Sequence, residues 1–200
     1  MLILKKINGL LYNLVMAPYY GFCLGGFGKS SKILKPTAID GPKRIFIGDK
    51  VLISYYGWLA AVPHTGNQQC KLSIGDGTYI GRFCHIYATS KIGIGKKVLM
   101  ADKVYISDNL HGHTDIDIAV IDQPIVQANE VTIGDGSWLG ENVCIIGASI
   151  GKHCVIGANA VVTKNIPDHC IATGIPAKII KRFNFETKAW QKTDESGAFI

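Results

Sequence analysis

The chain has 200 residues, enough for one domain with a buried core, and its 48% hydrophobic share and 23 glycines exclude a disordered chain. The formal net charge of +6 raises nucleic acids, anionic ligands and membrane surfaces as partners. The basic residues are scattered, however, without a stripe of interleaved aromatic residues, so we expect no nucleic-acid binding. None of the six cysteines forms a C-x-x-C pair, which favours reduced, buried thiols in a cytoplasmic protein.

Residues 1–24 carry two early lysines followed by a long apolar run. Apolar residues recur at helical spacing, which predicts an amphipathic helix ending near Pro18. Asn8 and Asn13 interrupt the run too often for a membrane-spanning helix, and no A-x-A cleavage site follows. Three roles stay open: a cap on the open end of the following fold, a contact with the inner membrane leaflet beside a lipid-linked substrate, and a cleaved signal.

From Arg44 onward an aliphatic residue recurs at six-residue spacing. The period is clearest in residues 130–164, at Ile133, Leu139 and Ile145 and, after one shortened step, at Ile150, Ile156 and Val162. Such a repeat predicts short, flat strands joined by tight corners and coiled into a parallel β-helix. The aliphatic residues would point inward, while Gly, Asn and Asp would supply corners where φ is often positive.

The period divides the chain into regions. We expect an N-terminal helix and linker over residues 1–43, the β-helix domain over 44–183, and a polar, loosely ordered tail over 184–200. Residues 60–71 and 108–129 break the repeat and are predicted to be loops that leave the coil. After the last coil, a proline in the sequence Gly174-Ile175-Pro176-Ala177 predicts a short helix over residues 178–183.

The second interruption is dense in histidine and aspartate, which suits proton transfer near neutral pH. His111 is the candidate general base, and Asp108, Asp115 and Asp117 are candidates to hold its other ring nitrogen. A base oriented in this way can take a proton from a hydroxyl group while that hydroxyl attacks a carbonyl carbon.

Two alternatives stay open for this stretch. It could be a solvated loop with incidental histidines, without a chemical role. A zinc site would instead use His85, His111 and His113, as the three-histidine sites of the gamma carbonic anhydrases do between subunits.

Three motifs are specific enough to suggest a family. Residues 98–113 read VLMADKVYISDNLHGH and end in an S-D-x-x-H stretch; residues 131–167 contain VTIGDGSWLG and VVTKNIP; residues 172–182 contain GIPAK. Together they resemble the hexapeptide-repeat acyltransferases. The similarity is strongest to the branch with maltose, galactoside and nodulation-factor acetyltransferases and the O-acetyltransferases of surface polysaccharide clusters, and it covers roughly residues 45–182.

This resemblance implies a left-handed parallel β-helix that works as a homotrimer, with active sites between neighbouring subunits. It implies acetyl transfer from acetyl-CoA to a sugar hydroxyl, with His111 as the base, no acyl-enzyme and no metal. Backbone N–H groups would stabilise the tetrahedral oxyanion. The acceptor expected is a glycan or a nucleotide- or lipid-linked sugar of surface polysaccharide or lipopolysaccharide biosynthesis, modified in the cytoplasm or at the inner face of the membrane.

The resemblance also implies which residues bind the two substrates. Ser90 lies nearest the position of an acceptor-facing Asn in the family, and Asn109 and His113 flank the base. The pantetheine arm would lie along the C-terminal coils beside Trp138 and small residues, and the CoA phosphates would meet basic residues. The small residues are Gly140, Gly147, Ala148, Gly157, Ala158 and Ala160, and the basic residues are Lys164, Lys178, Lys181 and Arg182.

Other functions stay open beside this one. Within the same enzyme class they are N-acetylation of an amino-sugar nucleotide and acetylation of a xenobiotic. Outside the class they are a structural β-helix without catalysis and the zinc hydratase.

Overall fold

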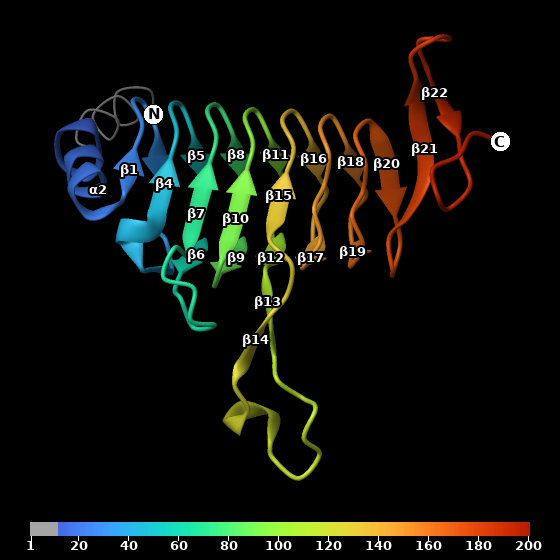
Figure 1. Ribbon diagram of the computed structural model, residues 1–200. Helices are drawn as coiled ribbons and strands as arrows, with labels where there is room; N and C mark the ends of the chain where they lie inside the picture. The colour runs from blue at the N-terminus through green and yellow to red at the C-terminus, as the bar shows by residue number, and fades with distance from the viewer. Residues whose placement is uncertain (1–11) are drawn as a thin grey trace.

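The computed structural model describes residues 12–200 and has the form of a three-sided parallel β-coil (Figure 1). Sheet A contains β1 (Gly26–Phe27), β4 (Ile45–Ile47), β7 (Lys71–Ile74), β10 (Lys91–Ile94) and β15 (Val131–Ile133). Sheet B contains β2 (Lys32–Ile33), β5 (Leu52–Ile53), β8 (Tyr79–Ile80), β11 (Leu99–Met100), β16 (Trp138–Leu139), β18 (Val155–Ile156), β20 (Cys170–Thr173), β21 (Lys178–Asn184) and β22 (Ala189–Lys192). Sheet C contains β3 (Ala38–Asp40), β6 (Trp58–Ala61), β9 (His85–Ala88), β12 (Tyr105–Ser107), β17 (Cys144–Ile146) and β19 (Val161–Val162).

The six-residue period is the distance from one sheet to the next. Ile47, Ile53 and Leu59 point inward from sheets A, B and C in one turn, and each is at most 4% exposed. The same positions in later turns stack on them in parallel register, so each coil buries its aliphatic residues against its neighbours. The predicted parallel β-coil is therefore confirmed.

The corners between sheets A and B have one length throughout. Their left-handed position is taken by glycine at Gly77 and Gly136, with φ of 69° and 68°, but by Ser30, Lys50, Lys97, His153 and His169 elsewhere. The expectation that Gly, Asn and Asp supply the corners is thus only partly correct.

Aspartates join these corners from coil to coil, and their Oδ1 atoms accept backbone N–H groups of the preceding turn. The donor–acceptor pairs are Lys29–Asp49, Asp49–Asp76, Lys96–Asp135 and Lys152–Asp168, at 2.7 to 3.0 Å.

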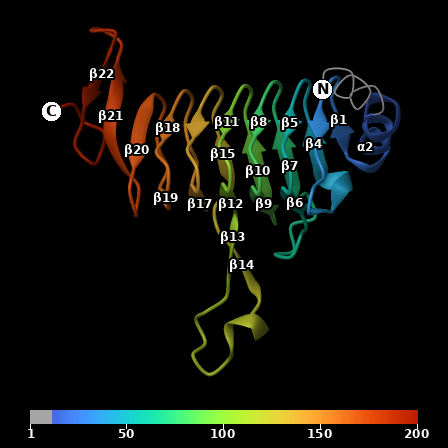
Figure 2. The same cartoon turned by 180° about the vertical axis from the view of Figure 1, so that it is seen from behind.

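The corner between sheets C and A varies in length and carries both interruptions. Residues 62–70 leave the coil between β6 and β7, and a longer segment leaves between β12 and β15 (Figures 1 and 2). Both predicted excursions are confirmed. All variation in chain length between successive sheets falls at this corner, because the other two keep the spacing of six residues.

A helical segment covers the N-terminal end of the coil. It comprises η1 (Tyr12–Met16) and α2 (Ala17–Cys23), so it continues past Pro18, which lies in the first turn of α2 and needs no N–H partner there. The Tyr12 hydroxyl accepts the Ile33 N–H at 2.6 Å, which satisfies part of the open strand edge of sheet B. The predicted capping role is therefore confirmed for residues 12–23, while the first eleven residues of the predicted helix lie outside the described part. In residues 12–200 no helix is long and apolar enough to cross a bilayer.

Three expectations about the ends of the coil are wrong. Residues 26–40 are not a linker: they form β1, β2 and β3, which pair in parallel with β4, β5 and β6. Residues 178–183 are not a helix but part of β21, which pairs antiparallel with β20 because Ile179 turns into the end of the core. The tail is also more ordered than expected, since β22 pairs with β21.

Candidate active site

The longer excursion is a hairpin that carries His111. Its strands β13 (Asn109–His111) and β14 (Ile125–Gln127) pair antiparallel and project away from the coil (Figures 1 and 2). Where the hairpin leaves sheet C, a pocket of about 290 Å³ opens between the two. Sheet C lines it with Trp58, His85, Tyr87 and Tyr105, and the hairpin lines it with Asn109, Leu110, His111 and Ile125.

Aromatic rings from three successive coils form the sheet side of this pocket. Trp58, His85 and Tyr105 are register neighbours on β6, β9 and β12. The Trp58 and His85 rings stack with centroids 4.2 Å apart, and Tyr105 meets His85 edge to face at 5.3 Å. Burial lowers the pKa of His85, and its Nε2 has no hydrogen-bond partner among residues 12–200. The imidazole of His85 is therefore neutral near pH 7.

The shorter excursion also reaches this pocket. His64 lies on that excursion, and its Nδ1 hydrogen-bonds with the Tyr87 hydroxyl at 3.0 Å. Burial raises the pKa of Tyr87, so the phenol keeps its proton near neutral pH. The pocket lining thus presents the imidazoles of His85 and His111 and the phenol of Tyr87, and His64 adds a third imidazole bonded to that phenol.

Asp108 precedes the hairpin, and its carboxylate forms its hydrogen bonds with groups other than His111. Its buried carboxylate accepts the N–H groups of Thr89, Ser90 and Lys91 at 2.7 to 2.8 Å, and the Thr89 hydroxyl at 3.1 Å. Both oxygens are thereby committed to the turn between β9 and β10. Within residues 12–200 no side-chain hydrogen bond joins a carboxylate to His111, and Asp115 instead accepts the N–H of Asp117 in the loop of the hairpin.

Gln127 fixes the base of the hairpin. Its Nε2 donates to the carbonyl oxygen of Asp108 at 2.6 Å, and its Oε1 accepts from the Thr65 hydroxyl at 2.6 Å. The Thr89 hydroxyl also lies 3.0 Å from that oxygen. One side chain therefore connects the hairpin, the coil and the shorter excursion.

The residues predicted to contact the acceptor separate in the structure. Asn109 lines the pocket and donates to the carbonyl oxygen of Tyr87 at 3.2 Å. Ser90 is buried away from the pocket, where its hydroxyl accepts from Asn67 at 2.7 Å. His113 is exposed and its Nδ1 lies 3.0 Å from the carbonyl oxygen of His111, outside the pocket lining.

The zinc alternative needs His113 beside His85 and His111. The His113 ring bonds instead with the carbonyl oxygen of His111, and residues 12–200 contain no group of three His, Cys, Asp or Glu side chains that could hold a metal ion.

The residues predicted to bind the donor do not lie in one groove of a single chain. Trp138 is half-exposed on sheet B, and Gly140, Gly157 and Ala158 lie at the corner between sheets B and C. A side chain at Gly140 would come within 2.6 Å of the Ala158 nitrogen, so coil packing already requires a small residue there.

Three of the predicted small residues cannot meet a ligand directly. Ala148 and Ala160 are fully buried in the core. Gly147 has φ of 56° and packs under the hairpin, where an added Cβ would lie 2.8 Å from Ala128 Cβ.

The basic residues predicted for the CoA phosphates lie near the C-terminal end of the coil. Lys164 is exposed after β19, and Lys178, Lys181 and Arg182 lie on β21. Lys178 forms an ion pair with Glu195, which leaves Lys164, Lys181 and Arg182 as the better candidates for phosphate contacts.

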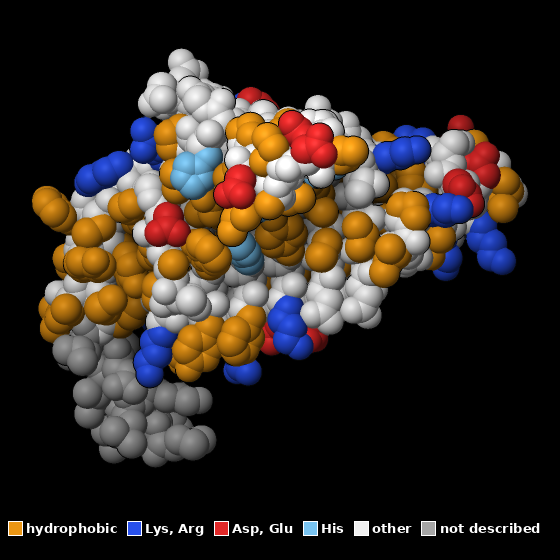
Figure 3. Space-filling model, turned by 90° about the horizontal axis from the view of Figure 1, so that it is seen from below, with side chains coloured by type: hydrophobic (Ala, Val, Ile, Leu, Met, Phe, Trp, Pro, Cys, Tyr) orange, Lys and Arg blue, Asp and Glu red, His pale blue; other side chains and the backbone are white. Residues whose placement is uncertain are grey.

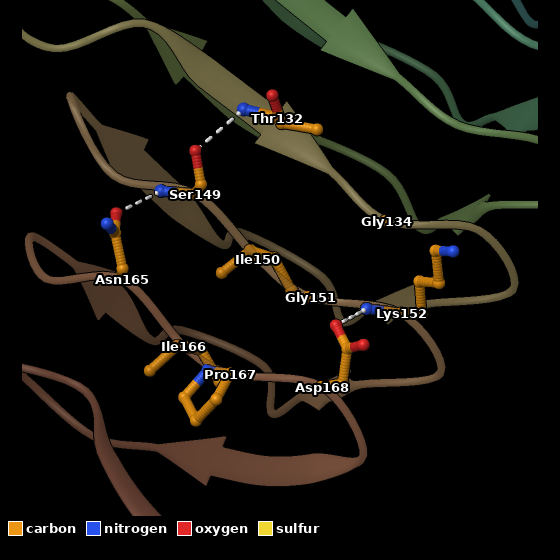
Figure 4. A pocket seen from close by; sticks show the side chains of 10 residues that line it. All are labelled: Thr132, Gly134, Ser149, Ile150, Gly151, Lys152, Asn165, Ile166, Pro167 and Asp168. Atoms are coloured by element: carbon orange, nitrogen blue, oxygen red, sulfur yellow. Dashed lines mark hydrogen bonds between the residues drawn. The ribbon is translucent and has the colours of Figure 1, made fainter.

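A larger groove, of about 530 Å³, lies on the side of sheet A near its C-terminal coils (Figure 4). Its polar groups bond to each other: the Ser149 hydroxyl accepts the Thr132 N–H, Asn165 accepts the Ser149 N–H, and Asp168 accepts the Lys152 N–H. No imidazole lines this groove, so we place the chemistry at the smaller pocket beside His111.

Comparisons with known proteins agree with this architecture. Residues 130–164 match the family model described as the hexapeptide repeat of succinyl-transferase. WbbJ of Escherichia coli, named for O-acetyl transfer in lipopolysaccharide biosynthesis, is 40% identical over 124 residues, which are 58% of this chain and 63% of WbbJ. The chain is thus similar to hexapeptide-repeat acetyltransferases.

Two solved structures share the fold of this hexapeptide-repeat chain. AntD, an N-acyltransferase from Bacillus cereus in complex with dTDP and 3-hydroxybutyryl-CoA, gives a TM-score of 0.68 at 18% identity over 85% of this chain and 89% of AntD. VCA0836 from Vibrio cholerae, in complex with acetyl coenzyme A, gives 0.59 at 22% identity over 82% and 74%. The chain spans from about a third to just under two thirds of the length of the curated relatives that it matches.

Proposed function

We propose that this chain is an acetyl-CoA-dependent O-acetyltransferase that acts on a sugar hydroxyl in surface polysaccharide or lipopolysaccharide biosynthesis. The observation that carries the proposal is the pocket in which His111 faces the aromatic column of Trp58, His85 and Tyr105. The similarity of the chain to WbbJ, which is named for O-acetyl transfer in lipopolysaccharide biosynthesis, supports the O-acetyl chemistry and the kind of acceptor. The complex of VCA0836 with acetyl coenzyme A supports the donor.

His111 is the general base in this proposal. Its imidazole takes the proton of the acceptor hydroxyl as the oxygen attacks the thioester carbonyl carbon. The tetrahedral intermediate then expels the CoA sulfur, which takes the proton back from the His111 imidazolium, so the products are the acetyl ester and CoA thiol. No acyl-enzyme is required, and burial raises the pKa of the nearby Cys84 to about 11, which keeps that thiol protonated.

The pocket suits a sugar acceptor. Aromatic rings offer an apolar surface to the ring carbons of a pyranose, while a few fixed polar groups orient its hydroxyls. Here those polar groups are Asn109, Tyr87 and the His64 bonded to it. We therefore assign acceptor recognition to side chains from three coils and both excursions.

We further propose that the coil is left-handed and that three copies associate, with each site between two of them. Trp138 lies on sheet B whereas His111 faces sheet C, so one copy alone does not bring the predicted donor contacts to the base. An outward apolar column on sheet B favours contact with a second copy: Leu52, Tyr79, Leu99, Trp138, Val155 and Ile171 are register neighbours. We place the protein in the cytoplasm, which its free cysteines support.

A thiol-release assay tests the function. Purified protein, acetyl-CoA and candidate acceptors should release CoA only with a hydroxyl-bearing glycan or a nucleotide- or lipid-linked sugar. His111→Ala should lower turnover by about 10² to 10⁴ while leaving acetyl-CoA binding intact, because it removes proton transfer alone. His113→Ala is the matched control and should keep near-normal turnover. Undiminished turnover in His111→Ala would remove this residue from the base role, and release that requires an amino sugar would favour the N-acetyl alternative.

A further inference from the structure

The N-terminal helical segment is apolar on two opposite sides. Tyr12, Met16, Tyr20 and Leu24 recur every four residues and pack onto the first coil. The other side carries Leu14, Val15, Tyr19 and Phe22, whose exposed fractions range from 54% to 80%. A helix that is apolar all round is normally covered on both sides. The outer side is therefore a contact surface, here called the outer helix face.

The same end of the chain holds all of its net charge. Residues 1–50 contain eight Lys or Arg and two Asp, whereas residues 51–200 contain thirteen basic and thirteen acidic side chains. Both of these carboxylates accept a hydrogen bond, Asp40 from the Trp58 indole N–H and Asp49 from the Lys29 backbone N–H. Lysines therefore outnumber carboxylates at this end of the chain, and Lys43 contacts the outer helix face directly: its ammonium lies over the Phe22 ring at 5.2 Å and donates to the Phe22 carbonyl oxygen.

Exposed aromatic residues also lie at the neighbouring corner of the coil, where Tyr55 shares a pocket with Tyr12, Met16 and Tyr20 of the helical segment. Tyr55, Tyr56 and Phe83 are all exposed, and the Tyr56 and Phe83 rings stack with centroids 5.2 Å apart. Seen from the hairpin side, hydrophobic side chains gather at the N-terminal end with basic ones at their rim (Figure 3). Aliphatic residues bordered by tyrosine and lysine are the composition of segments that lie in the membrane interface.

We propose that the outer helix face docks on an anionic membrane surface, with Leu14, Val15, Tyr19 and Phe22 at the level of the lipid headgroups and the lysines on their phosphates. A second copy of the chain is disfavoured as the partner, because it would bring two clusters of lysines together. Anionic lipid complements that charge. The inference goes beyond the proposed function and does not depend on it.

Docking in this way has a consequence that does rest on the proposed function. The strands of the pocket, β6, β9 and β12, follow the first coil one by one at about 4.8 Å each, so the pocket lies roughly 5 to 15 Å from the first coil. The helical segment adds about 10 Å, which puts the outer helix face roughly 15 to 25 Å from the pocket. An acceptor attached to a lipid would reach His111 over that distance. The substrate class favoured is therefore a lipid-linked glycan.

Vesicle co-sedimentation of the full chain tests the docking. The probes are vesicles of phosphatidylcholine alone and of phosphatidylcholine with phosphatidylglycerol. The wild type should bind the anionic vesicles, and binding should fall as salt is raised. The double variant Leu14→Ser and Phe22→Ser, and separately Lys35→Glu with Lys43→Glu, should each weaken binding at least about tenfold. Phe185→Ser and Lys188→Glu, at the far end of the coil, are matched controls that should bind like the wild type.

Thermal unfolding and turnover on a soluble acceptor accompany each variant, since none of these residues lines the pocket. Unchanged values show that the variants are folded and separate this test from the proposed function. Failure of the wild type to bind anionic vesicles would overturn the inference, as would variants that bind as well as the two controls. A change of self-association in the helix variants without vesicle binding would assign the outer helix face to a second copy instead.

Discussion

His85 lies between the rings of Trp58 and Tyr105, where a proton is costly to accommodate. Because its pKa is below the ordinary 6.5 in the folded state, the unfolded chain takes up the proton first as the pH falls. The contribution of neutral His85 to the free energy of unfolding is fully present above about pH 6.5. It declines as the pH falls from there through the lowered pKa of His85 in the folded state. Between about pH 7.5 and pH 5.5, the melting temperature of His85→Phe should therefore fall less than that of the wild type.

The measurement is the melting temperature of both proteins at each pH. His113→Phe, which replaces an exposed imidazole, should follow the wild type. An identical acid sensitivity in His85→Phe would show that this ring carries no such penalty.

Asp108 is close in sequence to the proposed base His111, but its hydrogen bonds stabilise the fold and do not orient the imidazole. Its two oxygens accept four donors from residues 89–91, and an amide in its place would turn an NH₂ group toward some of those donors. Asp108→Asn should cost about 3 kcal/mol of stability, while the pH dependence of turnover keeps its midpoint. Denaturant unfolding and a turnover profile check the two parts, with exposed Asp115→Asn as the control. A shifted midpoint with unchanged stability would restore an orienting role for Asp108.

Single residues were predictable from sequence only where the function lies in a local motif. His111 stands in S-D-x-x-H, so its place on an excursion beside a pocket was expected. Trp58, Tyr87 and Tyr105 were missed, and His85 was considered only as a zinc ligand, because the rings that meet in space lie 27 residues apart (Trp58 and His85) or 20 residues apart (His85 and Tyr105) in the chain. A signal existed: Trp58, His85 and Tyr105 each precede the inward residue of their coil, at Leu59, Ile86 and Ile106.

At the scale of elements, the hairpin is held to the coil mainly at its base. Gln127 bonds to the carbonyl oxygen of Asp108 and to Thr65, so Gln127→Ala should loosen both excursions together. We expect faster hydrogen exchange in residues 109–127 and lower turnover, with a loss of only about 1 to 2 kcal/mol in the coil. Gln69→Ala, in the shorter excursion, is the control. Unchanged exchange in the hairpin would mean that β13 and β14 hold their position without Gln127.

The elements that were wrongly predicted lie where two patterns compete. Phe27, Ile33 and Ile39 continue the six-residue period into the first coil, although this stretch was predicted to be a linker; Gly25, Pro36 and Pro42 around them are residue types that weaken strands. At the other end, Pro176 suggested a helix start, whereas alternate burial in KIIKRF satisfies a strand that closes the core. Local propensity yielded in both places to the need to cover the open ends of the coil.

At the scale of the whole molecule, assembly should depend on sheet B. Leu99 lies in the middle of the outward apolar column and is half-exposed in one copy. Leu99→Glu would place a charge in the proposed contact and should convert trimers to monomers, with turnover falling because each site then lacks its second side. Sedimentation equilibrium measures the change. Thr132→Glu, on exposed sheet A, should remain trimeric, and a monomeric wild type would contradict the proposed assembly.

The corner between sheets C and A is the edge of the coil that tolerates inserted segments. Because each turn of the coil keeps a spacing of six residues at the other two corners, new segments can be inserted at this corner without changing how the turns pack on one another. A short graft between Val162 and Ile166 should leave the melting temperature nearly unchanged, whereas the same graft beside Asp135 should lower it, since it would pull the carboxylate from its rung. Substrate choice can thus diversify independently of architecture.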